Sequence, residues 1–459
     1  MIRLLFYVDP ALLFEQFVPT ATVLNDHLLR FCGEALQKSG KFELKAVVSE
    51  IGKWEQESGK GPLGLELVAM PMERLRMALG GLKSLDAMRQ AFFTDTLDET
   101  ARARFAALVE ETLDGWKPDI VLSYPTAFAP LQRVFPEALC LVMENGLFSR
   151  FPFPRALRFD SVGFLHGFPN RHAEEIRNFP VTDSQRAQVA SFRSRLNALI
   201  DRYNPYLREI GEMRCRYRRL VLCPVPVANF YGEAAFDDQY VWLTNLMERM
   251  PRDIGVIATF HDSLSAQLNA RTSGYFASRY PNLVLFQRPG IGVASFWFFP
   301  HVDAILNCET MTGLQGLLSG PRVISLDRSY SDWFAQGRGV ESLETALDAP
   351  PADRDGLVFW TMTRFMVFAR RFGDADWYAN YFADKLERYR AGKTGFDFYG
   401  EIEDFGEVAD WLLSETEEGL KAGECRRRTL RRSVLRKIGK RIVKVGEWFL
   451  RQGEARIKK

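Results

Sequence analysis

The feature that most constrains the fold is a repeated alternation of short apolar runs with longer segments of helical periodicity. Such alternation is typical of open parallel α/β sheets, in which a helix connects each strand to the next. In the first half of the chain, strands are predicted at residues 3–8, 43–48, 65–69, 120–123 and 139–142. Helices are predicted at residues 14–37, 73–92 and 98–116, and the stretch 52–64, rich in Gly, Ser and Lys, is predicted to be a loop.

A polar segment at residues 183–212 carries apolar residues at helical spacing, which indicates a helical connector. A second α/β set follows it, with strands predicted at 220–224, 255–259, 283–286, 304–307 and 322–325, and helices at 240–250, 264–278 and 314–318. Helices at 357–389 are expected to close the chain. The sequence therefore predicts two Rossmann-like α/β domains, divided as 1–182, a connector at 183–215, a second domain at 216–350, closing helices at 351–415 and a basic tail at 416–459.

Composition excludes several functional classes. The 459 residues fit two or three domains, and a net charge of +2 argues against a nucleic-acid-binding polycation. Six cysteines without a CxxC pair argue against structural zinc and a disulfide scaffold. No GxGxxG or GxxxxGK[ST] motif is present, which disfavours a dinucleotide-dependent dehydrogenase and a P-loop enzyme. The N-terminus is interpreted as a first strand and not a signal peptide, and no transmembrane helix, cofactor or metal is expected.

The most informative candidate site follows the predicted strand 304–307. Thr310, Thr312 and Gly313 stand where a strand ends and a helix begins, so hydroxyls and backbone N–H groups could bind a phosphate there. An ordinary turn with a threonine N-cap explains the same residues equally well.

Three further groups lie at predicted strand or helix ends. His261 could donate to a phosphate or carboxylate, although a surface loop histidine is the simpler interpretation. Asp237 and Asp238 could supply a base or nucleophile, or could only cap a helix. Glu144 follows the last strand of the first half and could meet an acceptor hydroxyl, or could be a loop carboxylate paired with Arg150 or Arg158.

Together these segments resemble the capsule polysaccharide biosynthesis proteins. The carrying segments are Glu144-Asn145-Gly146, then 159–163 (FDSVG), the region 221–238 with its acidic pair, and 310–323 followed by Tyr330. That family consists of GT-B glycosyltransferases, many of which use CMP-Kdo. The sequence departs from it at His261-Asp262, where the family has His-Pro, and at Gln315, where it has Glu.

The resemblance implies a cytoplasmic, metal-independent glycosyltransferase of the GT-B architecture, working at the inner face of the membrane. It implies that Asp238 or Asp237 acts at the anomeric carbon and that Glu144 orients or deprotonates the acceptor hydroxyl. The donor, with a CMP-sugar favoured, would contact the nucleotide and donor residues, namely His261, Glu309, Thr310, Thr312, Gly313 and Tyr330. The acceptor would be a saccharide or a lipid-linked saccharide of capsule or lipopolysaccharide.

The basic segment 426–459 has apolar residues at helical spacing and Lys or Arg on its other faces, which is typical of an amphipathic helix on an anionic membrane. Docking on another protein or on nucleic acid is the alternative for this segment. For the whole chain, two other functions stay open: a GT-B transferase or epimerase acting on a UDP- or GDP-sugar, and a non-catalytic scaffold of a polysaccharide-assembly complex.

Overall fold

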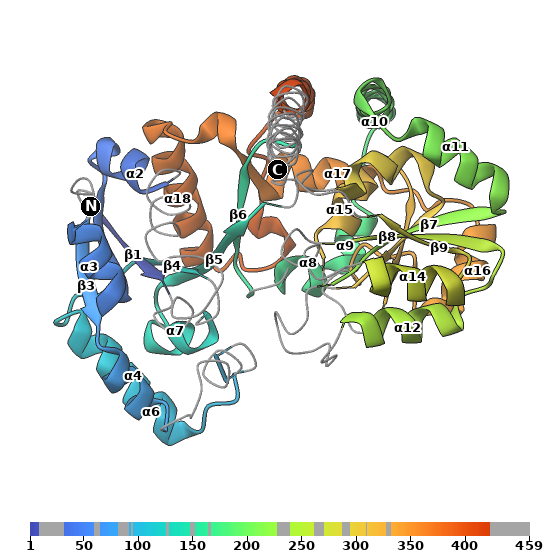
Figure 1. Cartoon of the computed structure of the whole chain (residues 1–459). Helices are drawn as coiled ribbons and strands as arrows, with labels where there is room; N and C mark the ends of the chain where they lie inside the picture. Colours follow the sequence, from blue (N-terminus) through green and yellow to red (C-terminus); the bar gives the residue numbers. More distant parts are fainter. Residues whose placement is uncertain are drawn as a thin grey trace, which may run out of the picture.

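The chain folds around two separate sheets, as the computed structural model in Figure 1 shows. The first sheet lies in the half that contains the N-terminus, and the second lies in the other half. The structure describes residues 1–8, 32–58, 65–80, 91–92, 95–124, 128–146, 152–163, 167–226, 239–260, 270–286, 294–308, 310–326 and 332–422.

The first sheet has seven strands in the order β13-β6-β5-β4-β1-β2-β3. The strands β1 to β5 are parallel, β6 pairs antiparallel with β5, and the edge strand β13 pairs antiparallel with β6. The central strands β1 and β4 contain buried apolar runs at residues 4–8 and 120–122, as expected of a sheet covered on both faces. The bounds are β1 Ile2–Val8, β2 Phe42–Ser49, β3 Glu66–Met70, β4 Ile120–Tyr124, β5 Leu139–Asn145, β6 Ala156–Asp160 and β13 Met366–Phe368.

The second sheet has six parallel strands in the order β12-β11-β10-β7-β8-β9. Because all of its strands are parallel, their carboxyl ends meet at one edge, where ligands bind in α/β sheets of this type. The bounds are β7 Arg219–Pro224, β8 Ile254–Thr259, β9 Leu283–Phe286, β10 Ala304–Asn307, β11 Arg322–Ser325 and β12 Gly337–Arg338.

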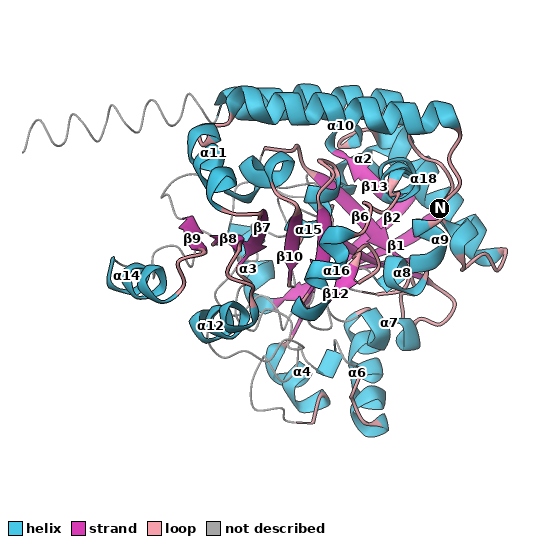
Figure 2. Cartoon of the chain, turned by 90° about the vertical axis from the view of Figure 1, so that its right-hand side faces the viewer, coloured by secondary structure: helices cyan, strands magenta, loops and turns pink. Residues whose placement is uncertain are grey.

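Helices cover both sheets and connect them (Figure 2). The long helix α10 begins at a capping box, in which Thr182 and Gln185 satisfy each other's backbone N–H groups. Helices of the first half are α2 Glu34–Ser39, α3 Glu50–Ser58, α4 Met72–Ala78, α6 Glu99–Thr112, α7 Phe128–Val134, α8 Gly167–Arg171 and α9 Ala173–Arg177. The connector is α10 Asp183–Tyr203 and α11 Leu207–Arg216, and the second half has α12 Gln239–Arg249, α14 Ala270–Arg279, the 3₁₀ helix η3 Ala294–His301, α15 Thr312–Leu317 and α16 Leu343–Asp348.

After the second sheet the chain returns to the first. Helix α17 (Asp355–Trp360) leads through a π-helical turn into β13, and α18 (Ala375–Arg390) then packs against α2. A final helix is described over residues 405–422 and lies beside α10, with ion pairs Arg195–Asp410 and Arg202–Glu417. One buried apolar cluster includes residues of both sheets, of α10 and of η3, so the two halves share a core.

The α/β fold class with two Rossmann-like sheets is confirmed. Each predicted strand corresponds to an observed one within a few residues, and the connector is helical as predicted. Two predictions were wrong in part. Residues 50–58 form α3 where a loop was expected, because their glycine lies within a run of helix-compatible residues. Residues 366–368 form a strand within the predicted closing helices, since they pair with the first sheet.

Candidate functional site

The carboxyl end of β10 is organised by one buried asparagine. Asn307 accepts a hydrogen bond at 3.0 Å from the N–H of Gly313 to its Oδ1 atom, which ties the strand to the start of α15. A Cβ atom at residue 313 would lie 2.6 Å from Asn307 Cγ, so only glycine permits this approach. Gly313 is therefore required for packing, whether or not the turn also binds a ligand.

The two threonines of the turn lie together. Their hydroxyl oxygens are 3.0 Å apart, and Thr310 Oγ1 also accepts the N–H of Thr312 at 3.3 Å. Thr312 is buried and Thr310 is half-buried. In this conformation the N–H groups of Thr312 and Gly313 donate to side chains of the turn itself. The groups that the turn can still offer to a ligand are hydroxyls and side-chain amides.

Two such amides are buried without an acceptor. Within the described part of the chain, neither Asn307 Nδ2 nor Gln315 Nε2 has a hydrogen-bond partner, although both side chains are at most 1% exposed. A buried donor without an acceptor costs about 1–3 kcal/mol. An oxygen atom of a bound ligand or water would remove that cost, so these amides mark the carboxyl end of β10 as a candidate binding site.

The neighbouring strand ends also carry polar groups. At the end of β8, the hydroxyls of Thr259 and Ser295 are 2.7 Å apart and buried. At the end of β11, Ser325 donates to Asp332 at 2.6 Å, and Arg338 binds the other oxygen of that carboxylate. The carboxyl edge of the second sheet is therefore lined by hydroxyl, amide and paired charged groups.

In the first sheet, Glu144 lies near the end of β5. Its Oε2 accepts a hydrogen bond from Arg158 Nη2 at 2.5 Å, and the two residues are direct partners across β5 and β6. Arg158 is only 1% exposed and Glu144 only 9%. Burial and the Glu144 charge together raise the pKa of Tyr124, at the end of β4, to about 12. The pairing of Glu144 with Arg158 is one of the two arrangements that the sequence allowed.

The other motif residues of the first half have clear structural roles. A Cβ atom at Gly146 would lie 2.5 Å from Met366 and 2.6 Å from Ala156, so glycine is required for packing against β6 and β13. The buried Asp160 carboxylate accepts N–H groups of Val162, Gly163 and Phe168, which shapes the turn that leads to α8. Burial raises the pKa of Asp160, against the opposing effects of Arg158 and these hydrogen bonds.

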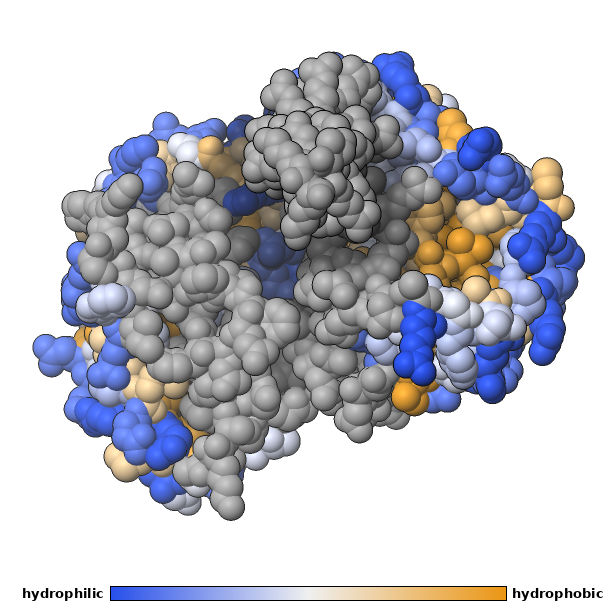
Figure 3. All heavy atoms as spheres, in the orientation of Figure 1, coloured by the Kyte–Doolittle hydropathy of each residue, from blue (hydrophilic) through white to orange (hydrophobic). Residues whose placement is uncertain are grey.

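A cavity of about 480 Å³ lies between α8–α9 and the segment 332–338. Its wall is polar, with Asn170, Arg177, Asp332, Gln336 and Arg338 among the lining residues. Figure 3 shows polar side chains, in blue, over the outer surface of both halves and an apolar patch, in orange, on the half that contains the second sheet. The sequence did not reveal this cavity because its walls come from segments about 160 residues apart. It did contain a signal for Asn307, a polar residue at the end of a buried apolar strand, but that amide was not predicted as a site residue.

None of the described predicted residues, Glu144, Thr310, Thr312 and Gly313, is among the lining residues of this cavity. The resemblance implies that the 310–313 turn and Glu144 face each other across the crevice between the two domains, and this arrangement stays a prediction. Asp237, Asp238, His261, Glu309, Tyr330 and the tail 426–459 lie outside the described residues. The residues that the structure does describe contain no cluster of potential metal ligands, and their helices include none with the length and apolarity to cross a membrane.

Comparison with known proteins bears on the fold. The sequence matches no protein-family model and no curated protein sequence. Among solved structures it is similar to the beta Kdo 2,7 transferase KpsC of Thermosulfurimonas dismutans, at 12% identity and TM-score 0.34, over 62% of this chain and 90% of that one. It is also similar to the trehalose 6-phosphate synthase of Burkholderia multivorans, at 12% identity and TM-score 0.40, over 86% of this chain and 100% of the other. The HepE protein of Anabaena, solved with UDP-glucose, has 10% identity and TM-score 0.31, over 84% and 100%.

The chain has a GT-B architecture. This conclusion rests on the coordinates: two Rossmann-like sheets, a helical connector between them, and a C-terminal segment that returns to the first sheet. The low identities and TM-scores add nothing about the substrate, because a shared fold does not specify a reaction.

Proposed function

We propose that this protein is a glycosyltransferase that transfers a sugar from a nucleotide-activated donor to a saccharide acceptor. The observation that carries the proposal is the pair of buried amides without acceptors, Asn307 and Gln315, beside the hydroxyls of Thr310 and Thr312. These groups stand at the carboxyl end of a central parallel strand, where α/β sheets bind nucleotides. Phosphate oxygens accept hydrogen bonds from amides and hydroxyls, so this donor set suits a nucleotide phosphate.

Neutral donors of this kind can support the reaction. As the bond between sugar and nucleotide breaks, negative charge develops on the leaving phosphate, and preorganised donors in a site without water stabilise that charge. Asp238 would act at the anomeric carbon, and His261, Glu309 and Tyr330 would contact the nucleotide or donor sugar. Movement of the two halves toward each other would exclude water and limit hydrolysis of the donor.

The ion pair with Arg158 refines the part proposed for Glu144. A carboxylate held at 2.5 Å by a buried guanidinium has a fixed orientation. Such a group is suited to accept a hydrogen bond from an acceptor hydroxyl and so to align its oxygen for attack. We therefore assign Glu144 to orienting the acceptor.

The finer assignments belong to the same proposal. The resemblance in residues 144–163 and 310–330 favours CMP-Kdo as donor and a bacterial surface polysaccharide, capsule or lipopolysaccharide, as product. The basic segment 426–459 would hold the enzyme at the inner face of the cytoplasmic membrane, where a lipid-linked acceptor is available. No cofactor, metal or nucleic acid is required by this proposal.

The decisive experiment measures transfer by purified Glu144→Gln and Asp238→Asn variants with the donor that the wild type binds. We expect each substitution to reduce kcat at least about 100-fold, because each removes a carboxylate that acts on the reacting groups. Glu144→Gln also leaves the buried Arg158 without its charge partner and should lower the melting temperature, so transfer is measured below that temperature, on folded protein. Asp253→Asn is the matched control, since Asp253 lies at the opposite edge of the second sheet and pairs with Arg218. Near-normal transfer by both test variants would refute the assignment.

The donor is identified first, by the shift in melting temperature of the wild type with CMP, UDP, GDP and CMP-sugars. A shift with CMP supports a CMP-sugar transferase. A shift with UDP or GDP would support a transferase or epimerase for those sugars instead. The absence of any shift would contradict a nucleotide site at β10 and would favour a scaffold.

A further inference from the structure

Four arginines lie near the place where the chain passes between its two halves: α17 meets the end of α9 where Gly356 lies against Phe179, and Arg193 binds Asp355 and lies against Gly320. Arg177 ends α9 and Arg193 lies in α10, whereas Arg322 begins β11 and Arg354 immediately precedes α17. The first half, the connector, the second sheet and the returning segment thus each contribute one guanidinium. Nothing in the proposed reaction at β10 uses these residues.

The cluster is short of acceptors. Arg193 donates to Asp355 at 3.1 Å and Arg322 donates to the carbonyl of Ala349 at 2.6 Å. Each still has a buried Nε atom without an acceptor among the described residues, and so does Arg354 at Nη1. Arginine can direct several donors to one planar oxyanion, and here donors from separate segments are left over.

The cluster is also short of negative charge. The ion pairs of the described residues place two carboxylates here: Asp353 pairs with Arg186, and Asp355 pairs with Arg193. Among the described residues, Asp355 is the one carboxylate that forms an ion pair with any of these four guanidinium groups, so positive charge exceeds negative charge in the described part of the cluster. Burial, and then repulsion from the other three arginines, lower the pKa of Arg354 to about 10. Like charges held together at a cost are typical of a ligand site.

The cluster adjoins the cavity of about 480 Å³, because Arg177 also lines that cavity. The opposite wall supplies Gln336 and Arg338, and Asn170 lies beside Arg177 on the same side. Among the described lining residues the one carboxylate is Asp332, which is already bound by Ser325 and Arg338. A volume of this size is typical of small-ligand sites. Of the four arginines, Arg177 is the one among the described lining residues, so the cavity offers room for a ligand whose acidic group binds Arg177 and approaches the other three.

We propose that Arg177, with Arg193, Arg322 and Arg354 behind it, binds an oxyanion group of a ligand held in the cavity between α8–α9 and residues 332–338. The ligand carries a phosphate or a carboxylate, the groups that match the arginine fork. This site is separate from the amides at the end of β10, and the proposal goes beyond sugar transfer. Because its arginines come from both halves, a bound anion also holds the two halves in one relative position.

Isothermal titration calorimetry of the full chain tests the site with two probes, pyrophosphate and trigalacturonate. The first presents phosphate and the second presents sugar carboxylates. We expect one of them to bind the wild type and the Arg177→Gln/Arg354→Gln variant to bind it at least tenfold more weakly, because two charged donors are removed. Binding of pyrophosphate alone would identify a phosphate ligand, and binding of trigalacturonate alone an acidic saccharide.

Arg208→Gln is the matched control, since Arg208 is exposed on α11 and only pairs with Glu212 at 3.6 Å. Arg177→Gln alone keeps the test decisive if the double variant does not fold, because Arg177 is exposed and its loss is tolerable. Two results overturn the site: neither probe binds the wild type, or binding is equal in the wild type and the Arg177 variant. Both results are independent of nucleotide binding at β10, which is measured separately with CMP, UDP and GDP.

Discussion

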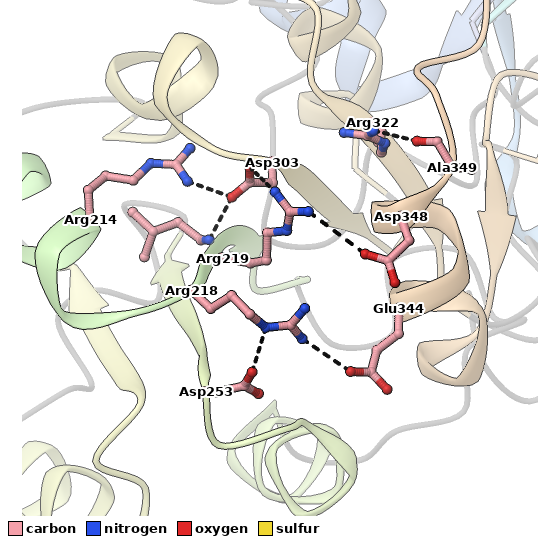
Figure 4. Close-up of polar contacts among 10 residues, drawn as sticks. Arg214, Arg218, Arg219, Asp253, Asp303, Arg322, Glu344, Asp348 and Ala349 are labelled. Carbon is pink, nitrogen blue, oxygen red and sulfur yellow. Dashed lines mark hydrogen bonds and ion pairs between the residues drawn. The ribbon is translucent and has the colours of Figure 1, made fainter.

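The two edges of the second sheet are built from the same strands, but they differ in whether their polar groups have partners. At the amino edge, Figure 4 shows arginines and carboxylates that point toward one another and are paired. Arg214 donates to Asp303 at 2.6 Å, and Arg218 donates to Asp253 at 2.6 Å. At the carboxyl edge, the buried amides of Asn307 and Gln315 have donors without acceptors in the described chain.

This difference separates stability from binding. The paired charges around Asp303 and Asp253 fix the loops that enter β7, β8 and β10, and both carboxylates are already bound by arginines. Unpaired donors at the carboxyl edge weaken the ligand-free fold, and they are satisfied only when an acceptor arrives. Substitutions at the amino edge should therefore change unfolding and not binding, and substitutions at the carboxyl edge should do the reverse.

The largest effect is expected from Asp303→Ala. The Asp303 carboxylate accepts the N–H of Leu220 and a hydrogen bond from Arg214, and it lies 3.8 Å from Arg219 (Figure 4). Its removal leaves one backbone donor and two guanidinium groups without this partner, so we expect a loss of about 3 kcal/mol in the free energy of unfolding. Urea denaturation measures this loss, and nucleotide affinity should stay unchanged.

Asp253→Ala on the same edge is the control for that experiment. Asp253 is about half exposed and pairs with the similarly exposed Arg218, so its loss should cost less than about 1 kcal/mol. Equal destabilisation by the two variants would show that the contacts of Asp303 add no more stability than the exposed ion pair of Asp253 with Arg218. Weaker nucleotide binding by Asp303→Ala would break the distinction between the edges.

A smaller effect, on binding alone, is expected from Gln315→Met. Methionine has a similar shape and removes the buried amide, so the free energy of unfolding should stay equal or rise. Affinity for the nucleotide should fall about tenfold, which corresponds to about 1.4 kcal/mol for one lost hydrogen bond. Isothermal titration calorimetry measures the nucleotide affinity of the variant and of the wild type. Gln188→Met is the control, because Gln188 is exposed. Unchanged affinity would mean that the amide is only part of the core.

The sequence predicted the sheets well because local pattern decides them. β1, β4 and β7 contain buried apolar runs at residues 4–8, 120–122 and 220–223, and neighbouring glycines, prolines and polar residues bound them. Strand β13 was missed because three residues between helices carry no periodic signal. Its conformation depends on pairing with β6, more than 200 residues earlier in the chain.

The site was predictable only in part, for a related reason. The strand end at 307 and the turn at 310–313 follow from the sequence, because a hydroxyl-rich turn after a buried strand is a local feature. The pairing of Glu144 with Arg158 follows from the antiparallel register of β5 and β6, which the sequence did not reveal. The arginine cluster requires four segments to meet, so no local pattern could indicate it.

A buried lysine away from both edges of the second sheet allows a further test, with the smallest expected effect, of how a buried polar group without an ion-pair partner changes stability. Lys385 in α18 is 1% exposed, and its Nζ donates to the carbonyl of Phe398 at 2.8 Å. Its ammonium lies 4.6 Å from the ring centroid of Tyr399, and none of the described carboxylates forms an ion pair with it. Burial lowers the pKa of Lys385 to about 7, with smaller contributions from the charges of Arg388 and Arg364, whereas Asp384 raises it.

The sign of the pH dependence follows from this pKa. Between pH 7 and the ordinary lysine value of about 10.4, the unfolded chain binds a proton that the folded chain releases, so Lys385 makes stability rise with pH. Below pH 7 both states are protonated and the contribution is constant. From pH 7 to 8 the gain is about 1 kcal/mol. The free energy of unfolding of Lys385→Met, measured by urea denaturation at each pH, should lack this gain. Subtracting its pH dependence from that of the wild type cancels the contributions of the cysteines and tyrosines, which both proteins share. An equal rise in both proteins would show that Lys385 stays charged in the fold, held by the aromatic rings and the Phe398 carbonyl alone.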